Sequence, residues 1–389
     1  MKDKELLKNI ILFVLIMIVL AGCIKGVKLV LEGDREEPTE ATTTELTTEL
    51  AVKTTSERTT EGTTVSTEQT TEHTSEISTE EITETATEEL TAKDDTTAPV
   101  FLTFTKNVEL KQGNVFDVHN YVGYADDIDR APELTVEGEV DTSVPGTYFV
   151  TLTVTDEAGH ATRDTMTVNV VTEFTPSSPR SKEDFETFSA NYKNDNTVLG
   201  IDVSRWQENI DFAKVKEAGC DFVIIRIGGY DDGSQYEDKY YRTNIRGAKA
   251  AGLQVGIYWH AEESSVEEVK SNVAYMMGIL DGEKLDFPIA YDWEDFSGFE
   301  KYNMNLHDIN TCFESFCEEV QSYGYEACIY SSKNFLENVW TNENHHPVWL
   351  AHYTDRTTYE GDYYMWQQGS TGRIAGIDTD VDFDIWYKD

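Results

Sequence analysis

The chain has 389 residues, enough for two or three domains, and its 73 Asp and Glu against 31 Lys and Arg give a formal net charge of −42 at pH 7. Such a charge repels the phosphates of nucleic acid, so nucleic acid is excluded as a partner. We expect a monomer.

Residues 1–31 have the order of an export signal. Lys2, Lys4 and Lys8 precede an apolar run, Ile10 to Leu20, that is too short for a comfortable membrane span. Leu20-Ala21-Gly22-Cys23 looks like a bacterial lipobox, in which Cys23 would carry the lipid. The alternative is an uncleaved signal anchor. Either interpretation puts the remaining chain at the outer face of the cytoplasmic membrane, held there by its N-terminus.

Residues 32–97 consist largely of Thr, Glu and Ser, with Thr-Thr-Glu recurring irregularly. A segment of this kind cannot bury enough apolar area to offset the entropy of ordering, and its like charges repel. We therefore expect a disordered stalk, which the density of Thr would also allow to be glycosylated.

Residues 98–172 predict a small antiparallel β-sandwich. Tyr148, Val150, Leu152 and Val154 alternate with threonines, so one face of this strand is apolar. The segment from Pro145 to Gly159 resembles bacterial immunoglobulin-like surface domains, which implies a rigid spacer or a module that binds wall glycan or protein.

One loop of this sandwich contains Asp126, Asp127 and Asp129. The three acids suggest calcium, but they lack the ligand spacing of a known calcium loop. We expect an exposed acidic loop.

Residues 173–196 read as a linker with a short helix near Phe185, and residues 197–389 as an α/β domain. Alternation of strands and helices early in this domain requires parallel strands with crossover helices. Strand-like runs begin near Leu199, Phe222, Gln254, Pro288, Ala327, Val348, Tyr364 and Val381, and helical stretches near Asp211, Asn244, Val266 and Ile309. Eight strands with few helices predict a barrel that lacks several helices.

Asp292-Trp293-Glu294 ends the apolar run that begins at Phe287. Side chains two apart on a strand share a face, so Asp292 and Glu294 should project into one cleft. Close carboxyls resist ionising together, and one protonated acid beside one carboxylate is what glycosidic-bond cleavage needs.

The ordered motifs around this pair are similar to those of the glycoside hydrolase family 25 lysozymes, which are N-acetylmuramidases. The resemblance covers about half of the chain, from Val198 to the C-terminus. It is carried by the segments 199–207, 222–226, 250–258, 292–294, 327–331, 348–353, 365–368 and 376–384. It implies an irregular, flattened β/α barrel that hydrolyses the β-1,4 bond between N-acetylmuramic acid and N-acetylglucosamine in peptidoglycan.

The resemblance implies roles for four acids. Glu294 would be the general acid. Asp292 would stay ionised, either as a nucleophile or, as we favour, orienting the 2-acetamido group of the substrate. Asp202 and Asp382 would balance charge and hydrogen-bond the sugar or Asp292.

Aromatic side chains at strand ends match positions where the family binds sugar, and flat rings stack on pyranose faces. The predicted platforms are Tyr258, Tyr330, Trp349, Tyr353 and Trp366. Two departures from the family pattern leave the detail of sugar binding open: Tyr258-Trp259-His260 stands where Tyr-His-Phe is frequent, and Asp384 where Asn is frequent.

No metal or other cofactor is expected, because the histidines are too scattered for a ligand set. Cys220, Cys312, Cys317 and Cys328 read as buried thiols, although a Cys220–Cys328 disulfide is compatible with an oxidising exterior. Two other functions are weighed. A family 18 chitinase-like enzyme also ends a strand in Asp-x-Glu, but its longer acidic pattern is absent before Asp292. A glycan-binding surface protein on an inactive barrel would not need all four acids.

Overall fold

The computed structural model describes residues 91, 93, 95–174 and 182–388. The predicted export signal, Cys23 and the predicted stalk up to residue 90 lie outside the described residues. Within them, no helix is both long and apolar enough to cross a bilayer.

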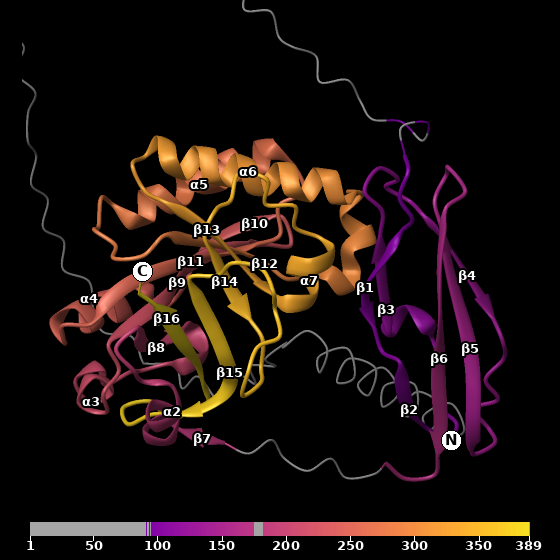
Figure 1. Cartoon of the computed structure of the whole chain (residues 1–389), viewed down its shortest axis with the longest axis horizontal. Coiled ribbons are helices and arrows are strands. Elements are labelled where there is room, and N and C mark those ends of the chain that lie inside the picture. Colours follow the sequence, from indigo (N-terminus) through magenta and orange to yellow (C-terminus); the bar gives the residue numbers. More distant parts are fainter. Residues whose placement is uncertain (1–90, 92, 94, 175–181, 389) are drawn as a thin grey trace, which may run out of the picture. The chain divides into compact units, whose positions relative to one another are not determined.

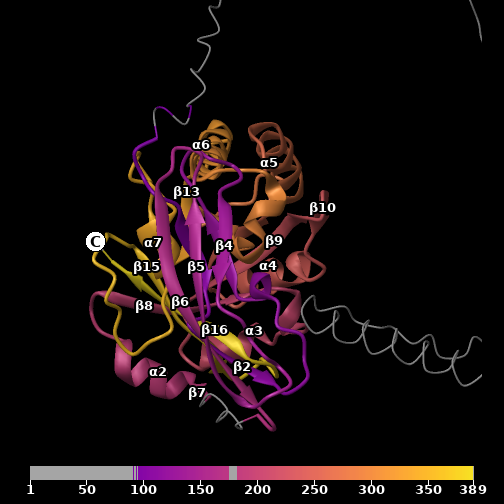
Figure 2. The same ribbon diagram turned by 90° about the vertical axis from the view of Figure 1, so that its right-hand side faces the viewer.

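The first described domain is a β-sandwich of six strands (Figures 1 and 2). One sheet pairs β1 with β3, and the other has the order β2-β6-β5-β4. The strands are β1 Val100–Phe104, β2 Asn107–Lys111, β3 Val122–Ala125, β4 Glu133–Glu137, β5 Gly146–Thr155 and β6 Ala161–Val171, with a 3₁₀ turn at Val118–Asn120.

The core of the sandwich follows the predicted alternation. Val150, Leu152 and Val154 are buried, while the threonines between them are partly exposed. The prediction of a wholly antiparallel sandwich was wrong, because β2 runs parallel to β6. The acidic loop is also not simply exposed, since Asp126 has an exposed fraction of 1%.

The second domain is a closed barrel of eight strands. Its ring has the order β8-β9-β11-β12-β13-β14-β15-β16 and closes because β8 pairs with both β9 and β16. The ring strands are β8 Thr197–Val203, β9 Phe222–Asp231, β11 Gln254–Ala261, β12 Ile289–Trp293, β13 Ala327–Ser332, β14 Val348–Ala351, β15 Met365–Arg373 and β16 Val381–Tyr387. Each predicted strand and helical stretch of this domain is present.

Strands β8 to β15 run parallel around the ring, and β16 is antiparallel to both of its neighbours. The antiparallel β16 brings its first residues beside the last residues of β8, where Asp382 is the register partner of Asp202. Gly200 is required in β8, since a Cβ there would lie 2.5 Å from the ring of Phe222.

Few helices cover the barrel. The longest, α5 Val266–Leu280 and α6 Leu306–Ser322, lie side by side (Figure 1). The other elements are α2 Phe185–Tyr192, α3 Phe212–Glu217, α4 Tyr241–Ala250, α7 Lys333–Asn338, the 3₁₀ turns Arg205–Gln207 and Phe296–Tyr302, and the short strands β7 Glu183–Asp184 and β10 Ser234–Glu237.

The second half of the predicted linker belongs to the barrel domain. Strand β7 pairs with β15, and the predicted short helix is present as α2. Phe185 and Phe188 of α2 are buried against Phe383 of β16, at ring-centroid distances of 5.2 Å and 4.7 Å.

Candidate active site

The period of two in the barrel strands separates an outer core from an inner one. In β8, Leu199 and Ile201 belong to the outer cluster that faces the helices, whereas Val198 belongs to the inner cluster. The same alternation in β12 gives Tyr291 and Trp293 to the outer cluster and Ala290 to the inner one. Asp202 and Asp292 stand at inner positions of these strands, near their carboxyl ends.

The predicted acid pair has two different environments. Asp292 lies within β12 and is 5% exposed, whereas Glu294 follows the last residue of the strand and is exposed. One carboxylate oxygen of Asp292, Oδ1, is buried without a hydrogen-bond partner among the described residues. The two carboxyls are close enough for the charge of Glu294 to raise the pKa of Asp292.

Three acids come from the paired strands β8 and β16. Asp202 is 6% exposed, Asp382 is half-buried, and Asp384 is fully buried. The carboxylate of Asp384 accepts a hydrogen bond from Trp349 Nε1 at 2.9 Å. Burial raises the pKa of Asp202, and the neighbouring charges of Asp384 and Glu294 raise it further.

Gln367 on β15 holds part of this cluster in position, although sequence reasoning gave it no role. Its Nε2 donates to Asp202 Oδ2 at 2.7 Å, and its Oε1 accepts from the hydroxyls of Tyr330 at 2.8 Å and Tyr353 at 2.9 Å. The side chain is 3% exposed. Its spacing of two residues from Met365, which belongs to the inner cluster, was the signal that could have identified a polar side chain on the inner face of β15.

Arg226 on β9 is the buried cation of the site, and it was also missed. Its Nε bonds Asp238 Oδ2 at 2.8 Å, and its side chain is 7% exposed. One terminal nitrogen, Nη2, is buried without a partner among the described residues. The charge of Arg226 lowers the pKa of Asp292 and Glu294, opposing the effect of burial.

The predicted division of roles, a charged Asp292 beside a protonated Glu294, stays a prediction. Loss of contact with water raises the pKa of both carboxyls, and the charges of Glu294 and Asp202 raise that of Asp292 further. Burial likewise raises the pKa of Asp382 to about 9. Desolvation therefore favours the protonated form of each of these carboxyls.

The predicted aromatic platforms divide into three groups. Tyr258, Tyr330 and Trp349 pack together at inner positions, with ring centroids 6.3 Å apart for Tyr258–Trp349 and 4.6 Å for Tyr330–Trp349. Tyr353 is 49% exposed and offers a ring to a ligand. Trp366 does not fit the prediction, because it stands on the outer face, is 3% exposed, and donates Nε1 to His352 O at 2.9 Å.

Trp349 is also covered, with 2% of its surface exposed, so it supports the inner wall and presents no open face. An aromatic residue outside the predicted set is open instead. Trp206 lies in the turn that follows β8 and is 58% exposed. The guanidinium of Arg205 stacks over its ring, 5.0 Å from the centroid.

A cleft of about 450 Å³ opens beside Glu294. Its wall includes Trp293 from β12, Tyr330 and Ser331 from β13, and Tyr353 after β14. Helix α7, absent from the sequence-based prediction, contributes Asn334 and other residues to one side. Glu294 of the acid pair thus borders a hollow large enough for a sugar unit.

The cysteines take no part in this cleft. All four described cysteines are free and buried, and burial raises the pKa of each thiol. Among the described residues, the groups of three or more side chains that could hold a metal ion lie around Asp95, in the sandwich domain.

A closed β/α barrel with carboxyl groups gathered at the carboxyl ends of its strands is typical of glycoside hydrolases. Residues 201–377 match the family model described as glycosyl hydrolases family 25, and residues 102–170 match that of the bacterial surface protein Ig-like domain. The chain therefore carries an immunoglobulin-like domain, followed along the sequence by a family 25 glycosyl hydrolase domain.

The relatives of the chain include named lysozymes. It is 27% identical to the autolytic lysozyme of Clostridium acetobutylicum over 48% of this chain and 55% of that protein. It is also 27% identical to lysozyme M1 of Streptomyces globisporus, over 48% of this chain and 66% of the relative. The chain thus spans little more than half the length of the first of these relatives. A solved bacterial lysozyme from Streptomyces coelicolor aligns with 24% identity and a TM-score of 0.43, over 49% of this chain and 92% of that one.

Proposed function

We propose that the chain hydrolyses the β-1,4 bond between N-acetylmuramic acid and N-acetylglucosamine in peptidoglycan. The observation that carries this proposal is the arrangement of Asp292 and Glu294 at the end of β12, beside Asp202 and Asp382, with Glu294 bordering an open cleft. The match to family 25 and the relatives named lysozymes support the same substrate class.

Glu294 is the general acid of the proposed reaction. It stands at the open cleft, where a glycosidic oxygen can reach it, and burial of its surroundings raises its pKa, which favours the proton-bearing form. Its proton passes to the leaving oxygen as the bond to the anomeric carbon breaks. Arg226 opposes the rise in pKa and leaves the resulting carboxylate stable enough to form.

Asp292 orients the 2-acetamido group, so that the carbonyl oxygen of the substrate attacks the anomeric carbon. Its unpartnered Oδ1 can accept the acetamido N–H. A hydrogen bond from that N–H favours the ionised carboxylate and so lowers the pKa that burial raises in the free protein. Substrate binding, in this mechanism, ionises Asp292.

This route gives two displacements and therefore retention at the anomeric carbon. NMR of the first-formed product tests the stereochemistry. An initial α-anomer would exclude the route, and a trapped ester on Asp292 would replace the acetamido oxygen by a protein nucleophile.

Asp202 and Asp382 are proposed to position Asp292 and the sugar, since their charges act on the Asp292 carboxyl. Tyr258, Tyr330 and Trp349 form the inner wall, and Tyr353 is the predicted aromatic that is open to stack on sugar. No cofactor takes part in the proposed reaction.

For the whole protein, we propose a monomer held at the outer face of the cytoplasmic membrane by lipid on Cys23, with peptidoglycan strands as its substrate. The order of Lys2 to Lys8, the apolar run and the lipobox supports this anchor. Cys23→Ala should abolish lipid labelling and leave unprocessed precursor. Unchanged size and membrane association would instead indicate an uncleaved anchor.

The decisive test of the activity is digestion of purified peptidoglycan, with the new reducing ends identified after borohydride reduction. New reducing ends on N-acetylmuramic acid support the proposal. Reducing ends on N-acetylglucosamine would indicate a different glycosidase specificity, such as that of the family 18 alternative, and no cleavage would favour the glycan-binding alternative.

Glu294→Gln keeps the size of the side chain but cannot donate the acidic proton, so the rate should fall by about 10²–10⁴-fold with the fold intact. Near wild-type turnover by the folded variant would contradict the role of Glu294.

A further inference from the structure

Three carboxylates meet in the immunoglobulin-like domain, far along the sequence from the acids of the barrel. Asp95 precedes β1, and Asp126 and Asp127 follow β3. One oxygen of each carboxylate lies within 4.8 Å of those of the other two. The side chain of Asp95 is 1% exposed and the residue Asp126 is also 1% exposed, so two of the three acids are withdrawn from water.

The hydrogen bonds of Asp126 leave half of its carboxylate unused. Its Oδ1 accepts from the backbone N–H groups of Ile128 at 2.9 Å and Asp129 at 2.7 Å. Its Oδ2 is buried and has no hydrogen-bond partner among the described residues. A buried, unpaired carboxylate oxygen is costly unless a proton or a cation compensates for it.

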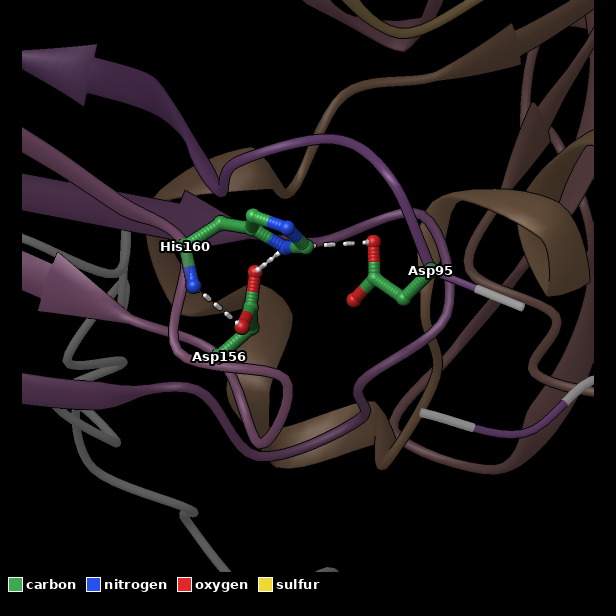
Figure 3. A group of neighbouring side chains, drawn as sticks. All are labelled: Asp95, Asp156 and His160. Carbon is green, nitrogen blue, oxygen red and sulfur yellow. Dashed lines mark hydrogen bonds and ion pairs between the residues drawn. The ribbon is translucent and has the colours of Figure 1, made fainter. Parts of the chain in front are cut away.

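A histidine lies beside this cluster. Within the described residues, His160 Nδ1 lies 3.8 Å from Asp95 Oδ1. Figure 3 shows this histidine between Asp95 and Asp156, and the Asp156 Oδ2 takes the closer contact, at 3.1 Å. Burial raises the pKa of Asp126, and the charges of Asp95 and Asp127 raise it further.

We propose that Asp95, Asp126 and Asp127 bind a divalent cation that prefers oxygen ligands, and that this cation is Ca²⁺. Three carboxylates supply three to six of the six to eight oxygens that Ca²⁺ takes, and waters complete the shell. Water has access, because a cleft of about 510 Å³ is lined by Asp126 and Asp127 together with Thr97. Asp129 stays outside the site, because its two oxygens accept from Ala131 N and Glu157 N.

The cation has a structural consequence, since the loop that supplies two of its ligands also holds the barrel domain. Leu306 N, in the first turn of α6, donates to the backbone oxygen of Asp126 at 2.8 Å. Two residues later in the loop, Ile128 O accepts from Asn305 Nδ2 at 2.6 Å. Arg130 then forms a bidentate ion pair with Asp308 of α6, at 2.7 Å and 2.9 Å. Binding of Ca²⁺ would therefore fix the segment around Asp95 to a loop that is bonded to the catalytic domain.

The test is calorimetric titration of CaCl₂ into the full chain after removal of metals with a chelator. We expect one Ca²⁺ per chain with a Kd of roughly 10⁻⁷–10⁻³ M, the range of sensor and extracellular sites. Asp126→Asn retains an oxygen for the two backbone bonds but removes the charge, and should weaken binding at least tenfold. The matched control is Asp164→Asn, a half-buried acid on β6 outside the cluster, which should bind as the parent does.

Thermal unfolding gives a second measurement. Ca²⁺ should raise the midpoint of the parent and of Asp164→Asn, but not that of Asp126→Asn; if this last variant does not fold, Asp127→Asn takes its place. No saturable binding up to about 10 mM Ca²⁺ would overturn the proposal. So would equal affinity of Asp126→Asn and the parent, or a tighter site for Zn²⁺ that disappears in His160→Gln.

Discussion

Replacement of Gln367 by Leu tests whether this buried amide organises the catalytic acids. The substitution introduces an apolar side chain of similar size and leaves three groups without their partner: Asp202 Oδ2 and the hydroxyls of Tyr330 and Tyr353. The hydroxyl of Tyr353 can turn to water, because that residue is 49% exposed. Asp202 and Tyr330 are 6% and 8% exposed and cannot do so without local rearrangement.

The expected cost follows from these burials. An unsatisfied buried polar group costs about 1–3 kcal/mol, so two such groups should lower the free energy of unfolding by about 2–6 kcal/mol. Activity should change as well. Gln367 lowers the pKa of Asp202, so its removal raises that pKa and should shift the pH dependence of kcat/KM.

The assay is guanidinium unfolding followed by tryptophan fluorescence, combined with pH–rate profiles on purified peptidoglycan. Gln368→Leu is the matched control, because Gln368 is the next residue, is 7% exposed, and donates to Thr354 O at 3.2 Å. It should lose about 1 kcal/mol and keep the parent pH profile. Equal destabilisation of the two variants, with unchanged pH profiles in both, would refute the argument.

Three further outcomes are expected. Asp384→Asn should keep activity within about threefold of the parent, because burial already favours the neutral form of Asp384 and the amide oxygen can still accept a hydrogen bond from Trp349. A loss of activity beyond tenfold would show that the reaction uses the negative charge of Asp384. Trp206→Ala should raise KM for peptidoglycan about 3- to 30-fold with an unchanged unfolding midpoint, since the ring is 58% exposed at the end of β8; an unchanged KM would exclude it as a sugar platform. The barrel should lose stability as pH rises from about 4 to 9. The folded state keeps protons on acids whose pKa is raised, that of Asp382 to about 9, whereas the unfolded chain releases them near pH 4. Each proton that only the folded state holds therefore lowers the free energy of unfolding by about 1.4 kcal/mol for every pH unit of increase. Unfolding midpoints that rose over this window would contradict the raised pKa values.

The sequence by itself determined the order of the elements and the location of the acids. Apolar runs interrupted by helical stretches sufficed to predict all eight barrel strands, because strand period and strand length are local properties. Asp202, Asp292 and Glu294 could be assigned to strand ends for the same reason. Period two also assigned Val150, Leu152 and Val154 to one buried face of the sandwich.

The tertiary structure decided which side chains face one another and which of them lose water. Trp366 and Gln367 are adjacent in β15 and therefore point to opposite faces, but only the closed barrel decides that the first faces the helices and the second faces Asp202. Burial of Arg226 as a cation near the acids depends on β9 joining β8 across the closed ring, a pairing that no local pattern contains. The raised pKa of Asp292 has the same origin, because desolvation depends on every chain segment that packs around a carboxyl and not on its neighbours in sequence.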